Sequence, residues 1–291
     1  MNTVSDSILK TKQYLGEDGG PKLIVLGAVH GNESCGPKAI ELICEGIESG
    51  EISIRRGAVT FVPISNPQAF EKEIRFVEED LNRVFRKLKD PITYEGKIAN
   101  ALCALVDEAD VLLDIHSTSA PGPTSVFIDF PTDANRALAG AVGAEYALLN
   151  WPELYDSNEF FESFDTTRYA FDAGKDGIIV ETGQHAEPEA AIRAYLMIMR
   201  LMRHLGIIEE AEAEERLPEL RSIQMIRLER KDSDNDELTR QWQHLEKVQK
   251  DTSIARRADG VEIVAEVDCV MLLPKHHARA GQEWFYLGIE K

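Results

Sequence analysis

Apolar runs of strand length alternate with helical segments through the first two hundred residues, and this alternation limits the chain to a small set of folds. Strand-like runs occur at residues 22–29, 57–64, 111–115, 124–130 and 177–180. Apolar residues at helical spacing occur at residues 36–49, 94–109, 134–142 and 187–204. Apolar runs without polar alternation are typical of parallel strands covered on both faces. The sequence therefore predicts an α/β fold with a largely parallel, mixed sheet flanked by helices.

The chain changes character after Gly206, where a β-rich region replaces this alternation. An acidic segment at residues 209–215 (EEAEAEE) is followed by strand-like runs at residues 222–228, 261–273 and 284–289. Strands without intervening helical patterns are typical of a separate β-rich unit. We expect an α/β catalytic domain over residues 1–208 and a smaller β-rich domain over residues 216–291.

The charge is strongly negative and unevenly distributed. The chain holds 51 acidic and 32 basic residues, for a net charge of −19. Residues 101–200 hold 17 acids and 5 bases, whereas residues 51–100, with 8 acids and 9 bases, form the only window of fifty that is not negative. Nucleic acids and anionic membranes bind basic surfaces, so neither is an expected partner. A small anionic substrate remains compatible, because the field inside a pocket can oppose the net charge.

The sequence patterns of a signal peptide, of a membrane-spanning helix and of closely spaced cysteine pairs are not found in the chain. The amino-terminal segment has no apolar core like that of a signal peptide, and the most apolar helix is interrupted by Arg200 and Arg203. The four cysteines are widely spaced, without a C-x-x-C pair. We expect a cytoplasmic chain with reduced, buried thiols. A homo-oligomer is compatible with the sequence, which does not fix the oligomeric state.

Two histidines and a glutamate follow two of the apolar strands. His30 and Glu33 lie in the turn His-Gly-Asn-Glu after the strand at 22–29, and His116 follows the strand at 111–115. Ligands of open α/β sheets bind at the carboxyl ends of strands, so these side chains can converge. Two imidazoles and a carboxylate form a catalytic zinc set with a fourth position open for water. Taken singly, each has an ordinary alternative, since a lone histidine is more commonly a hydrogen-bonded core residue.

Two further carboxylates lie close to the same strand ends. Glu181 ends the strand at 177–180 and precedes Thr-Gly, where it can act as a general base toward a metal-activated water. Asp114 shares a strand face with His116 and can orient the imidazole. The alternatives are a solvent-facing glutamate at a strand end and an aspartate in a capping or turn role.

Arginines beside an asparagine amide stand out in the window that is not acidic. Arg75 is followed by Asn82 and Arg83 in the run Asp-Leu-Asn-Arg, and Arg168 is one of five bases in the acidic hundred. A guanidinium can bind both oxygens of a carboxylate, so these residues are candidates for substrate binding. Each arginine alone is also compatible with a surface ion pair.

Ordered sequence blocks give these residues a context. From residue 22 to 185 the chain contains GAVHGNES, NPQAF, IRFVEEDLNRVF, LLDIHSTSAPG, TTR and IIVETG. In this order they resemble the aspartoacylase/succinylglutamate desuccinylase family, a branch of the zinc-carboxypeptidase-like hydrolases. The resemblance implies the zinc-carboxypeptidase-like fold with a C-terminal β-rich domain, and one zinc ion bound by His30, Glu33 and His116.

The same resemblance implies roles for the other candidates. It identifies Glu181 as the general base and Arg75 as the residue that polarises the scissile carbonyl. Asn82 and Arg83 correspond to the residues that bind the α-carboxylate of the amino acid. Arg168 resembles the arginine that binds a second carboxylate, although its distance in sequence from Glu181 is longer here.

We therefore expect a zinc-dependent amidohydrolase that cleaves the acyl group from a small, anionic N-acyl amino acid resembling N-acetylaspartate or N-succinylglutamate. The alternatives are a zinc carboxypeptidase acting on peptides, which needs an open cleft, and a binding protein on a decayed hydrolase scaffold. The sequence does not determine the acyl group or the amino acid.

Overall fold

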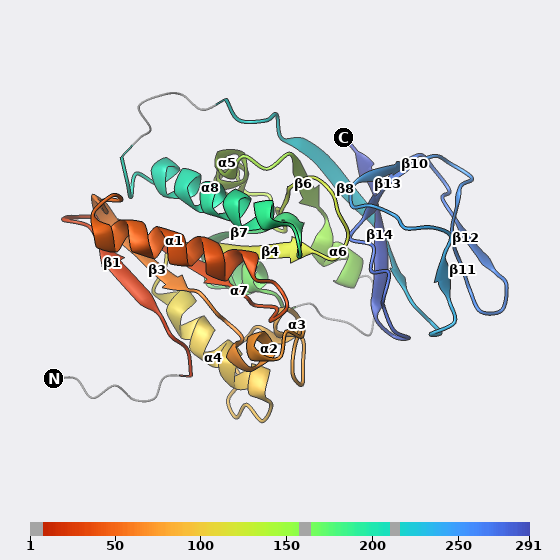
Figure 1. The fold of residues 1–291 in the computed structure, drawn as a ribbon, viewed down its shortest axis with the longest axis horizontal. Helices are drawn as coiled ribbons and strands as arrows, with labels where there is room; N and C mark the ends of the chain where they lie inside the picture. The colour runs from red at the N-terminus through yellow and green to blue at the C-terminus, as the bar shows by residue number, and fades with distance from the viewer. Residues whose placement is uncertain (1–7, 157–163, 210–215) are drawn as a thin grey trace.

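A computed structural model describes residues 8–156, 164–209 and 216–291. Among these residues the main feature is an eleven-stranded sheet with helices on both faces (Figure 1). The order of its strands is β1 (Lys12–Leu15), β3 (Arg56–Val62), β2 (Asp18–Gly27), β4 (Val111–Thr118), β7 (Asp176–Gln184), β5 (Ser125–Phe127), β6 (Tyr146–Leu149), β8 (Arg221–Arg230), β14 (Glu283–Glu290), β13 (Cys269–Leu272) and β10 (Glu246–Val248).

The centre of the sheet is parallel, as predicted. Strands β3, β2, β4 and β7 run in the same direction, whereas β5 pairs with β7 in the antiparallel sense and makes the sheet mixed. All eight residues of β4 are buried, which explains the apolar start of the strand, Val111–Leu113, and leaves Asp114 and His116 buried as well. Because β2, β4 and β7 are parallel, their carboxyl ends lie at one edge of the sheet, and any side chains that follow them can meet there.

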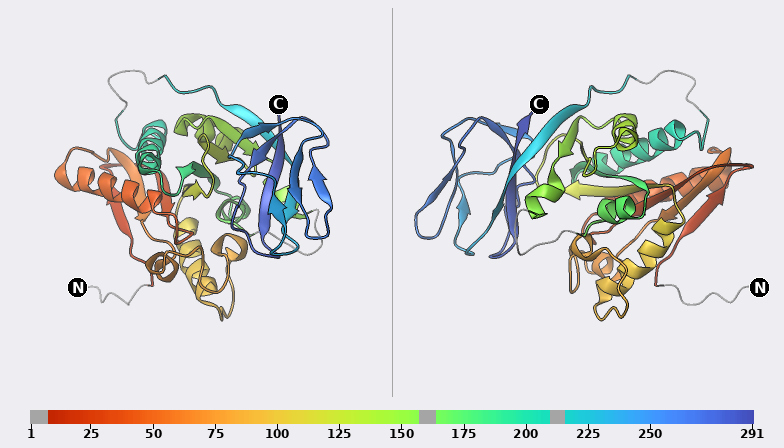
Figure 2. Two further views of the ribbon diagram at one scale, coloured as in Figure 1. Left: turned by 45° about the vertical axis from the view of Figure 1, so that its right-hand side comes forward. Right: turned by 180° about the vertical axis from the view of Figure 1, so that it is seen from behind.

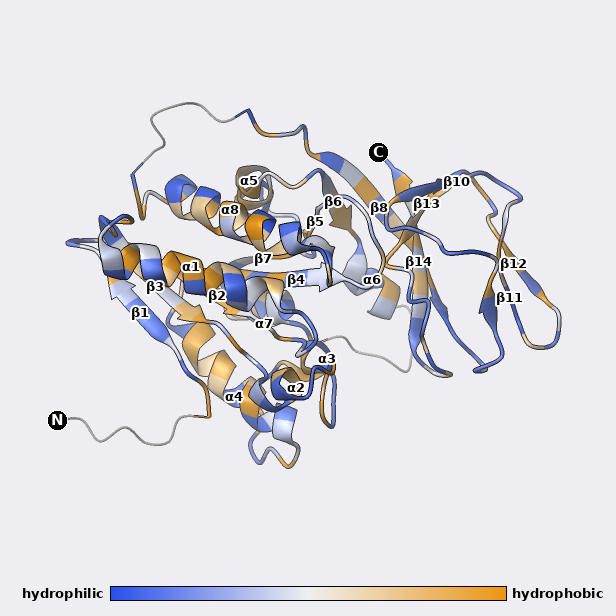
Figure 3. Cartoon of the chain, viewed as in Figure 1, coloured by the Kyte–Doolittle hydropathy of each residue, from blue (hydrophilic) through white to orange (hydrophobic). Residues whose placement is uncertain are grey.

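Helices cover both faces of this sheet. One face carries α1 (Cys35–Ser49), α5 (Asp133–Val142) and α8 (Pro188–His204), and the other carries α4 (Tyr94–Asp107) and α7 (Thr166–Asp172). Polar and apolar residues alternate along α1 and α8 in Figure 3, because each helix buries one side against the strands. The α/β prediction is therefore confirmed.

The C-terminal region is β-rich, as expected, and it extends the same sheet. Strand β8 pairs with β6 in parallel, and β14, β13 and β10 then add antiparallel strands. A second, three-stranded sheet of β9 (Glu237–Leu238), β11 (Ser253–Arg256) and β12 (Glu262–Val264) lies beyond them, at one end of the molecule (Figures 1 and 2). The division into domains at residues 208 and 216 stays a prediction, and the acidic segment after Glu209 lies outside the described residues.

One expected strand is wrong. Residues 261–273 form β12 and β13, which belong to different sheets, instead of one long strand. The residues between them include Glu266 and Asp268, which are exposed, so the chain turns there. Elements without a clear sequence signal are the edge strand β1, strand β6, and the short helices α2 (Pro67–Glu71), α3 (Leu81–Val84) and α6 (Trp151–Asp156).

Two expectations about the chain as a whole can be compared with the described residues. All four cysteines are buried and none forms a disulfide. Over the described ranges, no helix has both the length and the apolar character needed to cross a bilayer.

Candidate functional site

The turn after β2 is fixed by close backbone packing. A Cβ atom added at Gly31 would lie 2.1 Å from the carbonyl carbon of Ala69, so only glycine allows this approach. The Gly31 N–H donates a hydrogen bond of 3.2 Å to the carbonyl oxygen of Arg75. Ala28, two residues before His30, adopts a positive φ of 47°. Such backbone strain is concentrated at functional sites.

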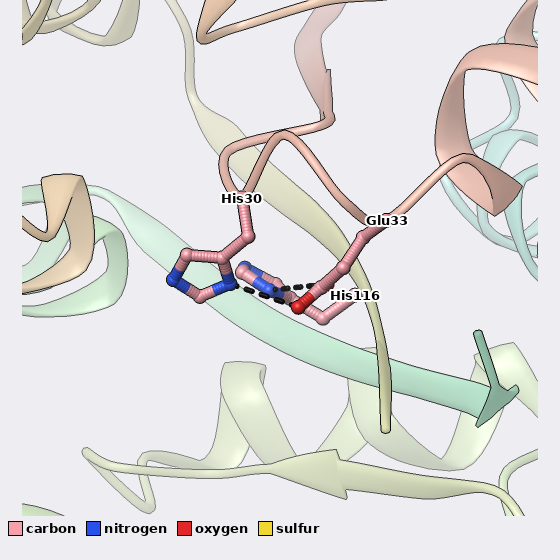
Figure 4. A group of neighbouring side chains, drawn as sticks. All are labelled: His30, Glu33 and His116. Carbon is pink, nitrogen blue, oxygen red and sulfur yellow. Dashed lines mark hydrogen bonds and ion pairs between the residues drawn. The ribbon is translucent and has the colours of Figure 1, made fainter. Parts of the chain in front are cut away.

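This turn brings His30 and Glu33 to His116 at the end of β4 (Figure 4). One ligand atom from each of the three residues lies within 4.8 Å of the others. Each Nδ1 atom of the two imidazoles lies 3.0 Å from an oxygen of the Glu33 carboxylate. All three side chains are buried. Two imidazoles and one carboxylate are a donor set that suits zinc, so these residues fit a metal ion.

The opposite side of each imidazole faces an aspartate. His30 Nε2 lies 3.1 Å from Asp80 Oδ1, and His116 Nε2 forms a 2.9 Å ion pair with Asp114 Oδ2. Carboxylates in this position hold the ring orientation of metal-binding histidines. The Asp114 carboxylate thus lies at ion-pair distance from the imidazole, and its orienting role stays a prediction.

The charges of the ligand residues depend on one another. Burial raises the pKa of Glu33, but the adjacent His30 and His116 lower it more, to well below its ordinary value. Burial also opposes the charge on His116, yet the carboxylates of Asp114 and Glu33 raise its pKa well above the ordinary value. In the absence of a metal ion these neighbours favour the charged forms of Glu33 and His116, and a metal ion bound there would compete with protons for the imidazoles.

Glu181 projects into the same site from the end of β7. Its partner in the β4–β7 register is His116. The side chain is buried, and its Oε2 atom has no hydrogen-bond partner in the part of the chain that the structure describes. Burial, and next the charge of Glu33, raise the pKa of Glu181 to about 8. Perturbed, unpartnered carboxylates are typical of catalytic acids and bases.

The segment from Arg75 to Arg83 lies against this centre. Arg75 Nε donates to Asp80 Oδ2 at 2.8 Å, and its Nη1 lies 3.8 Å from Glu33 Oε1. Asn82 is buried, and within the described ranges its Oδ1 atom accepts no hydrogen bond. The guanidinium of Arg83 donates from Nε and Nη2 to Oε1 of Glu283, at 3.1 and 2.7 Å.

A buried carboxylate anchors this segment from behind. Glu95, in the first turn of α4, has no exposed surface. It accepts hydrogen bonds from the backbone N–H groups of residues 77, 78 and 79, at 2.7, 3.1 and 3.2 Å. The Asn66 amide also donates to it at 3.2 Å. Glu95 therefore fixes the backbone that carries Arg75 and Asn82.

The candidate residues surround one cavity of about 300 Å³, at the small end of ligand sites. Seven of the eight sequence-predicted residues line it: His30, Glu33, Arg75, Asn82, Arg83, His116 and Glu181. Arg168 does not. It lies in α7, where its Nε is 3.4 Å from Asp172 Oδ2 and its guanidinium lies over the ring of Phe130. The structure thus brings together every predicted residue except Arg168.

Sequence reasoning missed the wall that the C-terminal region contributes. Lys275 and Glu283 line the cavity and form a 2.9 Å ion pair, and the buried Tyr286 hydroxyl lies 2.6 Å from that of Tyr155. Asp129 and Asp165 line it as well. No local motif marks these residues. Glu283 offered one signal of a role in the site, because it is a charged residue at the start of the apolar strand β14.

Comparisons with known proteins identify relatives of this chain. The aspartoacylase of Xenopus tropicalis is 29% identical over 198 residues, which cover 63% of this chain and 60% of that protein. The succinylglutamate desuccinylase of Pseudomonas fluorescens (strain Pf0-1) is 24% identical over 191 residues, covering 60% of this chain and 56% of that protein. The chain thus spans less than two thirds of the length of these curated relatives.

A solved structure supports the fold. The product-bound ectoine utilization protein EutE (DoeB) from Ruegeria pomeroyi is similar with a TM-score of 0.77, at 21% identity, over 96% of this chain and 88% of that chain. The family model described as the succinylglutamate desuccinylase/aspartoacylase catalytic domain matches residues 19–205. The chain therefore belongs to the succinylglutamate desuccinylase/aspartoacylase family.

Proposed function

We propose that this chain is a zinc-dependent hydrolase that cleaves the acyl–nitrogen bond of a small N-acyl amino acid. One observation carries the proposal. The donor set of His30, Glu33 and His116 adjoins the unpartnered carboxylate of Glu181 inside a cavity that arginines also line. The deacylase names of the relatives, aspartoacylase and succinylglutamate desuccinylase, agree with this chemistry.

His30, Glu33 and His116 would hold the metal, with Asp80 and Asp114 behind the imidazoles. A zinc ion supplies Lewis acidity toward the amide carbonyl, lowers the pKa of water, and by its charge lowers the pKa of nearby carboxyl groups.

The side chains of the protein perform the proton transfers and stabilise the developing charge. Glu181, as the base, takes a proton from the attacking water and returns it to the leaving amine, so that water and an amide give a carboxylate and a free amino acid. Arg75 donates hydrogen bonds to the carbonyl oxygen as negative charge develops on it. Asn82 and Arg83 bind the α-carboxylate and hold the scissile bond beside Glu181.

The C-terminal wall favours a small substrate over a peptide. His276, His277 and Ala278 lie between β13 and β14 and line the same cavity. A carboxypeptidase needs room for an extended chain on one side of the scissile bond. A cavity of about 300 Å³ that this segment lines suits a metabolite instead.

A substrate screen tests the proposal. Purified protein with one equivalent of zinc would be assayed against N-acetyl and N-succinyl amino acids and against short peptides. We expect hydrolysis of N-acyl amino acids that is lost on chelation and in Glu181→Gln. Preference for peptides would contradict the substrate class, and near-normal turnover by Glu181→Gln with its metal retained would contradict the mechanism.

A further inference from the structure

Two buried carboxyl groups that the proposed reaction does not use line the cavity. Asp129 follows β5, and Asp165 is the N-cap of α7. The Thr167 hydroxyl lies between them, 2.5 Å from Asp129 Oδ2 and 2.9 Å from Asp165 Oδ1. Asp129 is 4% exposed and Asp165 is 2% exposed.

Among the described residues, no cation lies at ion-pair distance from either carboxylate of this pair, although the charge of Arg83 acts on both. Over residues 8–156, 164–209 and 216–291, neither carboxylate forms an ion pair, and the Oδ1 atom of Asp129 has no hydrogen-bond partner. Burial, and next the adjacent Asp165, raise the pKa of Asp129 well above its ordinary value. Asp165 accepts a hydrogen bond from the Arg168 N–H, so Asp129 Oδ1 is the unsatisfied atom of the pair. A buried polar atom without a partner is costly, which indicates that a bound group completes the site.

The cations of the cavity, in contrast, already have carboxylate partners. Arg75 pairs with Asp80, while Arg83 and Lys275 share the single carboxylate of Glu283. Two cations against one anion leave one positive charge, which matches the α-carboxylate of an amino acid. Because Arg168 does not line the cavity, Arg75 and Arg83 are the only arginines among the described residues that line it, and none is left for a second carboxylate.

We propose that Asp129 and Asp165 form a subsite for a side-chain ammonium group, so that the preferred substrate is an N-acylated diamino acid. The α-carboxylate binds at Asn82 and Arg83, and the ammonium group donates hydrogen bonds to Asp129 Oδ1. A dicarboxylic amino acid would instead place a second negative charge beside two acids. This inference deepens the proposed function and rests on it.

A matched substrate series tests the inference. The zinc-loaded protein would be assayed with the Nα-acetyl derivatives of diaminopropionate, diaminobutyrate, ornithine and lysine, with those of aspartate and glutamate, and with uncharged acetylnorvaline. We expect kcat/KM for at least one diamino acid to exceed that for acetylnorvaline about tenfold or more. Higher kcat/KM for the dicarboxylic substrates would overturn the inference and leave the deacylase function intact.

Two variants test whether Asp129 and Asp165 cause the preference for diamino substrates. In Asp129→Asn the ratio of kcat/KM between the best diamino substrate and acetylnorvaline should fall about 10- to 100-fold. Asp165→Asn, which keeps a good helix cap, should lower the same ratio and is the second test if Asp129→Asn does not fold. Asp18→Asn, which removes an exposed acid of β2 outside the cavity, is the matched control. An unchanged ratio in both Asp variants would overturn the inference.

A binding measurement separates this inference from the proposed function. Calorimetry with the free diamino acids, the expected products, needs no turnover. Binding by wild type that weakens about tenfold or more in Asp129→Asn supports the subsite even if no acyl amino acid is hydrolysed. Absence of all hydrolysis would contradict the proposed function, whereas equal binding by both proteins would contradict the subsite.

Discussion

Glu181 gives a prediction that can be tested without a substrate. In the metal-free protein its carboxyl group is buried, its Oε2 lacks a described hydrogen-bond partner, and its pKa is about 8 against an ordinary value of 4.5. The change is Glu181→Gln, which keeps the shape of the side chain and removes the ionisation. We expect the variant to become more stable than wild type as the pH rises.

The direction of this pH dependence follows from the number of protons that the folded and unfolded states bind. Between pH 4.5 and about 8 the folded protein retains a proton on Glu181 that the unfolded chain releases. Stability falls with pH wherever the folded state binds more protons, so wild type loses free energy of unfolding across this window. A pKa difference of this size corresponds to a loss on the order of 5 kcal/mol in the free energy of unfolding by pH 9. Glu181→Gln lacks this loss, and the two proteins should be nearly equal at pH 4.5.

The assay is urea unfolding of both proteins in the presence of a chelator, at pH values from 4.5 to 9. The free energy of unfolding of Glu181→Gln minus that of wild type should increase steadily over this range. Glu266→Gln, which removes an exposed carboxylate, controls for the loss of a charge. A difference that stays constant with pH would refute the reasoning, because the carboxyl group would then titrate alike in both states.

Three further substitutions test the architecture of the site. Glu95→Gln should lower the free energy of unfolding by about 1–3 kcal/mol and reduce kcat, because the amide cannot accept every backbone hydrogen bond; unchanged denaturant curves and kinetics would contradict the anchoring role. Glu283→Gln should cost about 3 kcal/mol in thermal or urea unfolding, because Arg83 loses its buried counterion; a stability equal to wild type would contradict this. Gly31→Ala should cost about 3 kcal/mol and weaken zinc binding in calorimetry, because the new methyl group overlaps the backbone of Ala69; normal zinc affinity would contradict the packing argument.

The sequence predicted the central fold and the grouping of the three candidate metal ligands because their signals are local. The buried strand β4 begins with an apolar run, and His30, Glu33 and His116 lie at or just after strand ends that a parallel sheet brings together. The long helix α8 was equally clear from its apolar periodicity and its proline at the start.

The remaining parts depend on contacts distant in sequence. Arg83 meets Glu283 two hundred residues later, and nothing in either local sequence indicates that pairing. The acids Asp129 and Asp165 follow a short strand and begin a short helix, where an aspartate is normally a turn or cap residue. For Arg168 the resemblance implied binding of a second carboxylate, but the local sequence could not determine where the guanidinium lies.

Zinc titration of the metal-free protein tests the central claim most directly. Activity toward the best N-acyl amino acid should be absent without metal and should rise linearly to a break at one zinc per chain. His116→Ala should show neither the break nor the activity, because it lacks one of the three ligands. Full hydrolysis by protein shown by elemental analysis to contain no metal would contradict the account.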